Sequence, residues 1–426
     1  MAVYYVDVNC KAEGNSGLNK NEPVKNYRFI DLKPGDKVLF KRGSFIRDRL
    51  WNINGEEGNP VVYGAYGEGD KPVFCTSVNL SCENDWKEVK KGIWETTVEI
   101  PAIACNFIFD GGKAFGTLRW NYEELTLQGD FYDNCFGKYS FEVGHKIYLK
   151  SEINPAQYYS EIECATNFHR VMAESGHDII FEDLCFTNNG IHAIAGEDGG
   201  KNIIVRNCDF KHIGGCVWDR EQKIRFGNAV EFWDICENVT VENCSFDNIY
   251  DSAVTHQGSD KCLPAVNTHF DNNVYIKCGM AAYEGRDVLP INSSFNGNLC
   301  IDAGEGFSKL GEELPRYSEI WPQPMGHHIF LWRIEKATEG GSLEIKNNIF
   351  DNSPIGAAIY SIISKEAESQ ITLSGNTYYT ENKELLNRYG GQNYADFSEY
   401  EKSGTEDDCR YMKIDRAKIL LERGAK

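Results

Sequence analysis

Two stretches that repeat each other decide the fold: NIIVRNCDFKHI at residues 202–213 and NVTVENCSFDNI at residues 238–249. Related stretches begin at residues 178, 267, 292, 342 and 370, so that consecutive repeats start 24, 36, 29, 25, 50 and 28 residues apart. A base period of about 24–25 residues explains these steps if short loops are inserted and the longest step holds two periods, one of them a degenerate coil. Self-similarity at such a period predicts a stacked solenoid.

Within each repeat, apolar residues alternate with polar ones, as Val239 and Val241 do. This period of two indicates strands rather than helices. An asparagine then precedes a second short strand, and asparagine tolerates tight turns and can stack in hydrogen-bonded ladders. The Leu-x-x-Leu-x-Leu frame of leucine-rich repeats is missing. We therefore predict an all-β fold, a single-stranded right-handed parallel β-helix with coils of about 24–25 residues.

The repeats also predict how the chain is organised. We expect one β-helix domain over residues 1–426, with irregular N-terminal coils and a cap over 1–175 and regular coils that carry the active-site face over 176–380. Residues 381–426 would form a C-terminal cap or tail. The last stretch, from Asp415 onward, is typical of a short helix with Asp415 as its N-cap, and we expect this helix to cover the last coil.

Composition excludes several classes of function. The net charge is −20, from 44 basic and 64 acidic residues, which argues against a nucleic-acid partner and, more weakly, against a strongly anionic polysaccharide. A local basic cleft could still override the overall sign. No apolar run reaches the roughly 18 residues of a membrane span, so we expect no membrane partner. The N-terminus lacks a signal peptide, which predicts a cytoplasmic protein, or a secreted or periplasmic one if a signal has been removed.

The chain has 15 cysteines and no Cys-x-x-Cys pair, so zinc-finger and redox motifs are absent. A buried free thiol behaves as a small apolar group. We expect most cysteines to be free and structural, as in a reducing compartment. Several lie inside apolar strand patterns: Cys185, Cys208, Cys244, Cys278 and Cys300.

The N-terminal part carries a resemblance. Residues 4–7 (YYVD), 14–17 (GNSG), 32–45 (LKPGDKVLFKRGSF) and 60–72, with its YGAYGEGD run, resemble the opening of bacterial β-helix carbohydrate enzymes of the pectin-lyase-like superfamily. The resemblance extends over nearly the whole chain. It implies the β-helix fold and action on carbohydrate, and it leaves the reaction open, because the superfamily holds hydrolases, lyases, epimerases and non-catalytic tail fibres.

Charged residues gather in the middle coils when the repeats are aligned on their aromatic or cysteine anchor. The position five residues after the anchor is Asp251 in one coil and Glu305 in another, and the position nine residues after it is Asp219, Glu284 or Lys309. The outer coils are apolar at both positions, which predicts a functional face at mid-helix. Asp251 and Glu305, or Asp219 and Glu284, would lie two coils apart, at about 9.6 Å, which favours an inverting glycosidase.

The strongest local signal is FGNAVEFW at residues 226–233 followed by YDSAVTHQG at 250–258, a block that resembles one in uncharacterised bacterial β-helix proteins. A glycosidase needs one protonated carboxyl and one carboxylate that activates water. The alternative is that these acids only cap or pair at loops. The predicted catalytic residues are Asp251, Glu231, Glu284 and His256.

The predicted substrate-binding residues are aromatic rings on which a sugar could stack and polar groups for its hydroxyls. Trp218 and Asp219 belong to an inserted loop, and His328 and Trp332 belong to the degenerate coil. No metal site is expected, because His328 and its neighbour His327 point to opposite faces of a strand. The full set is Trp233, Trp218, Asp219, Arg286, Lys309, His192, His328, Trp332 and Gln257.

These features favour a glycoside hydrolase acting on a poly- or oligosaccharide as a monomer or weak homo-oligomer without a cofactor. The runner-up is a polysaccharide lyase with Lys309, Arg286 or His256 as base and Tyr283 as acid, for which calcium is possible. A non-catalytic glycan-binding β-helix is the third alternative. The ordered Asn-x-Asp, Asp-Asp and Gly-His-Gly set of polygalacturonases is absent.

Overall fold

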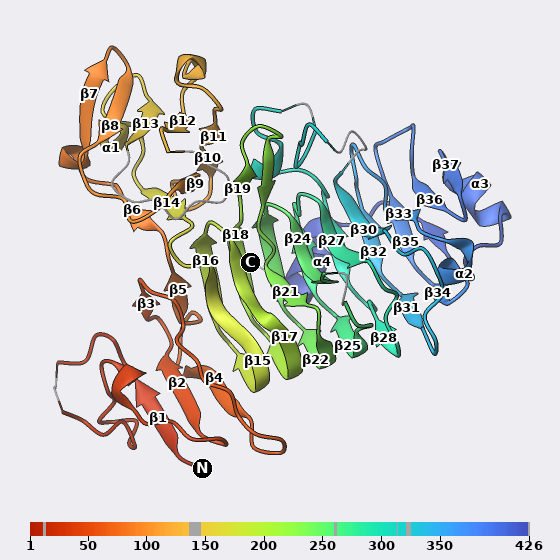
Figure 1. Ribbon diagram of the computed structural model, residues 1–426, viewed down its shortest axis with the longest axis horizontal. Coiled ribbons are helices and arrows are strands. Elements are labelled where there is room, and N and C mark those ends of the chain that lie inside the picture. The colour runs from red at the N-terminus through yellow and green to blue at the C-terminus, as the bar shows by residue number, and fades with distance from the viewer. Residues whose placement is uncertain (12–13, 136–145, 260–261, 313, 321–324, 425–426) are drawn as a thin grey trace.

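A computed structural model describes the chain except for residues 12–13, 136–145, 260–261, 313, 321–324 and 425–426. Most strands stack in parallel, each against the strand one coil before and one coil after it (Figure 1). The parallel β-helix predicted from the repeat is therefore confirmed.

The strands form three rows along the stack, which we name the site row, the second row and the third row. The first two rows belong to one 17-stranded sheet, because the long strands β15 (Val171–Glu182) and β17 (His192–Arg206) run through both. The site row continues through β21 (Val230–Trp233), β24 (Ser252–Gln257), β27 (Ala281–Arg286), β30 (His327–Trp332), β33 (Ile359–Ile362) and β36 (Asn387–Tyr389), to which β37 (Gln392–Tyr394) adds antiparallel.

The other two rows complete each coil. The second row also holds β1 (Val3–Val6), β2 (Lys37–Lys41), β4 (Val61–Tyr66), β22 (Cys236–Glu242), β25 (Val266–Asp271), β28 (Ser293–Ser294), β31 (Leu343–Lys346) and β34 (Ile371–Ser374). The third row is β3 (Phe45–Ile46), β5 (Val73–Cys75), β16 (Cys185–Asn189), β18 (Asp209–Ile213), β23 (Ser245–Ile249), β26 (Val274–Ile276), β29 (Leu299–Ile301), β32 (Ile349–Asp351), β35 (Thr377–Tyr379) and β38 (Arg410–Tyr411).

Aromatic rings and asparagines line up inside the stack. Phe210 stacks on Phe186 at 5.5 Å and on Phe246 at 4.8 Å between ring centroids, and such pairs contribute roughly 0.5–1.5 kcal/mol each beyond burial. The turn asparagines Asn207 and Asn243 have φ values of 51° and 54°, as expected for residues that tolerate the left-handed region. All fifteen cysteines are free and ten are buried, which confirms that most of them are structural.

The 50-residue step does not contain a coil. β28 pairs directly with β31, and β29 pairs directly with β32, so the step is one coil with an insertion over residues 302–326. The expectation of a degenerate coil is therefore wrong. A spacing of two periods cannot distinguish a coil from a loop of the same length, and here the described residues of the loop form one short 3-10 turn, Phe307–Lys309.

Residues 78–166 form an inserted unit beside the stack (Figure 1). Its strands pair mostly antiparallel in two small sheets with their own core, which includes Phe107 and Phe131; the sequence had predicted irregular coils over this part of the chain. The elements are β6 (Val78–Asn79), β7 (Trp86–Lys90), β8 (Ile93–Thr96), β9 (Ala104–Phe109), β10 (Ala114–Phe115), β11 (Thr117–Leu118), β12 (Asp130–Asp133), β13 (Ile147–Lys150), α1 (Pro155–Tyr158) and β14 (Ile162–Thr166).

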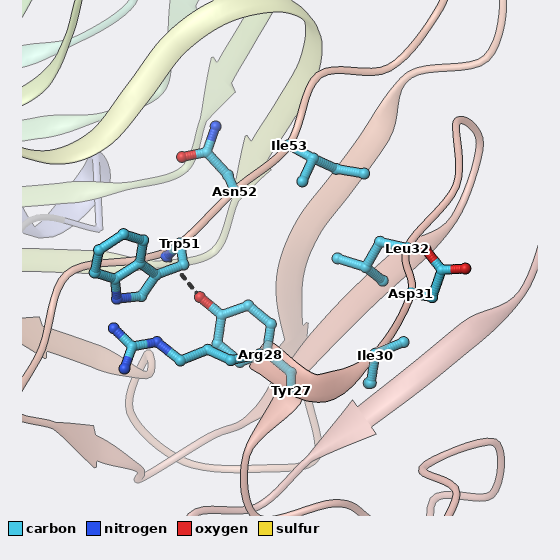
Figure 2. A pocket seen from close by; sticks show the side chains of 8 residues that line it. All are labelled: Tyr27, Arg28, Ile30, Asp31, Leu32, Trp51, Asn52 and Ile53. Atoms are coloured by element: carbon cyan, nitrogen blue, oxygen red, sulfur yellow. Dashed lines mark hydrogen bonds between the residues drawn. The ribbon is translucent and has the colours of Figure 1, made fainter.

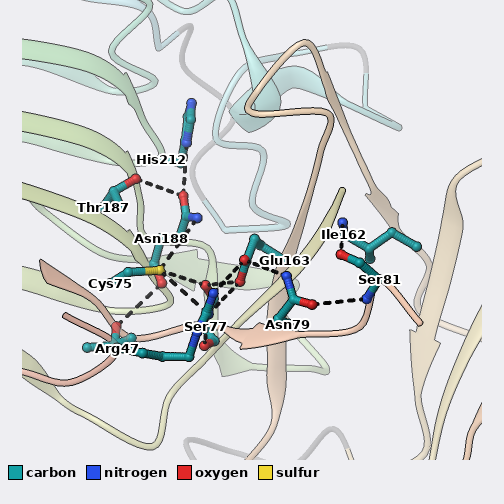
Figure 3. A network of polar contacts seen from close by, with 11 residues as sticks. Arg47, Cys75, Ser77, Asn79, Ser81, Ile162, Glu163, Thr187, Asn188 and His212 are labelled. Atoms are coloured by element: carbon teal, nitrogen blue, oxygen red, sulfur yellow. Dashed lines mark hydrogen bonds and ion pairs between the residues drawn. The ribbon is translucent and has the colours of Figure 1, made fainter. Parts of the chain in front are cut away.

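A buried polar network joins the inserted unit to the first coils (Figure 3). Arg47 donates two hydrogen bonds of 2.8 Å to the carboxylate of Glu163, which also accepts from Ser77 at 2.6 Å and Asn79 at 2.9 Å. Burial alone would raise the pKa of Glu163, but these hydrogen bonds and the Arg47 charge lower it below its ordinary value. Glu163 is therefore held ionised at the joint.

The C-terminal segment closes the stack and then turns back along it. The helix α3 (Phe397–Lys402) packs Tyr400 on Tyr378 of the last coils at 5.5 Å. The helix α4 (Arg416–Glu422) has Asp415 as its N-cap, as predicted. However, α4 lies on the third row rather than over the last coil, since Arg416 pairs with Asp302 and Asp351. One further helix, α2 (Lys365–Glu368), precedes β34.

Candidate functional site

The register of the site row brings two of the predicted acids together. Glu231 on β21 lies beside Thr255 on β24, and Thr255 lies beside Glu284 on β27. Side chains alternate between the two faces of a strand, and residues of one row position share a face, so all three side chains project outward from the stack. At about 4.8 Å per coil, the backbones of Glu231 and Glu284 are separated by about 9.6 Å.

Two residues further along the same strands lies a second line of predicted residues. Trp233 pairs with Gln257, and Arg286 pairs with Trp332 on the following strands. The guanidinium of Arg286 lies 5.4 Å from the ring centroid of Trp332. The predicted rings and polar groups of this line therefore sit on the same face as the carboxyl groups.

Glu231 is held by Asn228 and His192. The side-chain amide of Asn228 donates a 2.5 Å hydrogen bond to Oε2 of Glu231, and the same oxygen lies 3.3 Å from Nδ1 of His192. Nδ1 of His192 accepts from the backbone N–H of Asn228 at 3.1 Å. Asn228 also accepts from the backbone of Ser252 in the next coil, so this carboxyl group has a fixed orientation.

Glu284 is almost fully buried. Trp332 donates a 2.8 Å hydrogen bond to Oε1, Ser252 lies 3.1 Å from Oε2, and the closest nitrogen of Arg286 is 4.0 Å from Oε1. Burial raises the pKa of Glu284, and the negative charge of Asp251 raises it further, against the opposing influence of Arg286. These surroundings favour the protonated carboxyl.

Asp251, the third predicted acid, is engaged by a residue that the sequence did not reveal. Arg316 binds both carboxylate oxygens of Asp251, at 2.8 and 3.1 Å, and both side chains are buried. Arg316 comes from the insertion over residues 302–326. The only signal for it in the sequence was the 50-residue step, which gave no reason to select this arginine.

Three inserted segments meet beside the carboxyl groups. The hairpin of β19 (Cys216–Asp219) and β20 (Ile224–Phe226) carries Trp218, which packs edge-on against Phe226 at 5.5 Å and is 44% exposed. Its tip contacts the 302–326 insertion, where Lys223 pairs with Glu319 at 3.1 Å. That insertion reaches the inserted unit through Glu312, which accepts from the Trp120 indole at 3.2 Å.

Two predicted histidines lie elsewhere. His256 is on the opposite face of β24 from Thr255, between Phe232 and Gly285, and burial lowers its pKa to about 4. His328 is also buried, with its ring 5.5 Å from that of Phe350, and burial lowers its pKa to about 3. Strand alternation places His256 on the face opposite the carboxyl column, and His328 packs against Phe350 in the interior, so neither ring lies beside the carboxyl groups.

Two other predicted residues, Asp219 and Lys309, do not lie in the column, because counting from the anchor ignores the insertions. Asp219 lies in the β19–β20 hairpin and accepts a hydrogen bond from the backbone of Gln222. Lys309 lies in the 302–326 insertion and pairs with Glu305 at 2.8 Å. The column positions assigned to Asp219 and Lys309 belong to Glu231 and to Phe330.

A cavity of about 600 Å³, whose lining does not include the carboxyl groups, lies at the N-terminal coils (Figure 2). It is lined by Tyr27, Arg28, Ile30, Asp31, Leu32, Trp51, Asn52 and Ile53. The guanidinium groups of Arg28 and Arg49 lie 4.4 and 4.7 Å from the centroid of the Trp51 ring. They occupy positions over the ring at which a sugar would stack. The carboxyl cluster is the better candidate for the functional site, because it holds buried acidic groups beside arginines and the pKa of Glu284 is raised there.

Within the described part of the chain, no group of three or more histidine, cysteine or acidic side chains is arranged to hold a metal ion. The described helices include none that is long and apolar enough to cross a membrane.

The chain matches no family model and no curated protein. It is similar in structure to XylC in complex with xylose, with 10% identity, a TM-score of 0.56 and coverage of 96% of this chain and 82% of that one. A protein described as a glycoside hydrolase gives 11% identity, a TM-score of 0.55 and coverage of 100% and 99%. Pectate lyase Pel9A gives 12% identity, a TM-score of 0.47 and coverage of 97% and 77%.

This chain has a parallel β-helix fold. The resemblance in the N-terminal sequence is thereby confirmed at the level of fold. At identities of 10–11%, the likeness shows the fold alone, so the reaction has to be argued from the site.

Proposed function

We propose that this protein is a glycoside hydrolase that cleaves with inversion, with Glu284 as general acid and Glu231 as general base. The observation that carries the proposal is the pairing of two carboxyl groups in one column, two coils apart, of which Glu284 is buried and has a raised pKa. The backbone separation of about 9.6 Å is close to the upper end of the roughly 6.5–9.5 Å that separates the carboxyl groups of inverting pairs, and well above the spacing of retaining pairs.

In this reaction the glycosidic oxygen takes the proton of Glu284 as its bond to the anomeric carbon breaks. A water molecule attacks that carbon from the opposite side and gives its proton to Glu231. Asn228 holds Glu231 in orientation, and Trp332 fixes one oxygen of Glu284. Asp251 is paired with Arg316, and its negative charge raises the pKa of Glu284.

The surroundings of the acids support a carbohydrate substrate. Trp218 exposes part of its ring beside Phe226, and Phe226 contacts His192 of the Glu231 group. Indole rings bind the apolar faces of sugars. Two neighbours in fold, one of them solved with xylose, act on or bind sugars by their descriptions, which makes xylo-oligosaccharides a sensible first substrate.

The test is to incubate the protein with xylo-, gluco-, galacto- and galacturono-oligosaccharides and to weigh the products by mass spectrometry. Products that together are heavier than the substrate by one water support hydrolysis. Unsaturated products without added water would contradict it and would indicate β-elimination, with Arg286 as the first residue to substitute. No product from any glycan would contradict the enzymatic assignment for these sugars.

A further inference from the structure

A buried hydroxyl that no described residue engages lies between the two proposed catalytic carboxyl groups. Thr255 occupies the column position between Glu231 and Glu284 and is 0% exposed. Its Oγ1 atom has no hydrogen-bond partner among the residues that the structure describes. A buried hydroxyl is normally hydrogen-bonded, and leaving it unpaired opposes folding.

The rest of this column does not explain a threonine. After Glu284 the column continues with Phe330 and Tyr360 on the next two strands, and valine would fill the space of Thr255 without an unpaired oxygen. Residues that break the local rules of packing are expected at functional sites. The unpaired hydroxyl therefore indicates a partner that enters with the substrate.

We propose that Thr255 is a positioning residue that holds the attacking water between Glu231 and the anomeric carbon. This inference rests on the proposed function. The hydroxyl of Thr255 shares one hydrogen bond with the water, either as donor or as acceptor. The water oxygen forms the new bond to the anomeric carbon, and one water proton passes to Glu231. The leaving oxygen takes the proton of Glu284, so that atoms and charges balance over the step. Thr255 itself exchanges no proton with the substrate.

The test compares Thr255→Val and Thr255→Ser with a matched control, Thr268→Val. Thr268 is also buried, on β25, but its hydroxyl lies 3.3 Å from the Cys236 thiol and is thus engaged. Thr255→Val should lower kcat about 10- to 100-fold, because a misplaced reactant loses that much, with KM nearly unchanged. Thr255→Ser should restore most of kcat, and the pH profile of both variants should match that of the wild type.

Thermal unfolding separates this role from a structural one. Thr255→Val should have a Tm equal to or above that of the wild type, because no hydrogen bond is lost, whereas Thr268→Val should have a lower Tm. An unchanged kcat in Thr255→Val, or a fall in its Tm like that of Thr268→Val, would overturn the inference. The Tm comparison does not depend on turnover, so it remains decisive for the unpaired hydroxyl if hydrolysis itself is not found.

Discussion

Glu231 and Glu284 carry the same functional group in different surroundings. Glu231 accepts from an amide and lies against an imidazole, while Glu284 is buried beneath an indole with a raised pKa. Pairs of titratable groups in unlike environments can divide acid and base roles. Their assignment leads to two predictions at the residue scale.

The first concerns the carboxyl groups themselves. Glu231→Gln and Glu284→Gln should each lower kcat about 10²- to 10⁴-fold, the usual contribution of a general acid or base. Initial rates on the hydrolysed oligosaccharide measure this. The matched control is Glu237→Gln on β22, since Glu237 pairs with Lys201 at the surface, and its kcat should stay at the wild-type level. Wild-type rates in either site variant would rule out that residue as acid or base.

The second concerns pH. Burial and the negative charge of Asp251 raise the pKa of Glu284, and the acid acts only while protonated, so activity should fall as pH rises through that raised pKa. Asp251→Asn removes one raising charge and leaves Arg316 unneutralised, and both changes lower the pKa of Glu284. The alkaline limb of the kcat/KM profile should therefore move to lower pH. A limb that stays in place or moves to higher pH would show that Asp251 does not influence the acid.

At the scale of elements, the insertions explain why the sequence predicted the strands but misplaced some site residues. The repeat predicted the strands and their stacking, because alternating apolar residues specify one buried face. Counting along the repeat misplaced Asp219 and Lys309, since the hairpin and the 302–326 insertion interrupt the coils. Glu231 was found because its block at residues 226–233 is rich in polar and aromatic side chains, and Glu284 because no insertion separates it from the anchor of its coil. Arg316 was not found, because its contact with Asp251 depends on how a loop folds back.

The ion pair between that loop and the stack can be tested by unfolding. Arg316→Met leaves the Asp251 carboxylate buried without a partner, which should lower the free energy of unfolding by about 3–5 kcal/mol. Urea denaturation followed by circular dichroism measures the change. In the double variant Asp251→Asn with Arg316→Met, most of the loss should return, because no buried charge remains. Equal stability of the single and double variants would mean that Asp251 is solvated in solution.

At the scale of the whole molecule, the inserted unit is joined to the stack through Glu163 and Arg47 (Figure 3). Glu163→Gln should weaken this joint by roughly 1.5–3 kcal/mol at neutral pH, the range for hydrogen bonds to charged groups. Hydrogen exchange should then speed up in residues 78–166 while the coils around Phe210 stay protected. An equal increase in hydrogen exchange in residues 78–166 and in the coils would contradict the claim that Glu163 and Arg47 mainly join the inserted unit to the stack.

The same carboxyl group gives the joint a pH dependence. Its pKa is lowered in the folded protein, so its contribution is fully present above the unfolded value and is lost as pH falls through the folded value. The difference between wild type and Glu163→Gln should thus shrink towards acid pH.

The central claim is hydrolysis with inversion between Glu231 and Glu284, and the measurement that tests it most directly is proton NMR of the first-formed anomer. A xylo-oligosaccharide, or whichever glycan the panel identifies, is hydrolysed in the spectrometer and the anomeric signals are followed before mutarotation. The account predicts that the new reducing end first appears with the configuration opposite to that of the bond cleaved. A first product of retained configuration, or one with a vinylic proton, would contradict it.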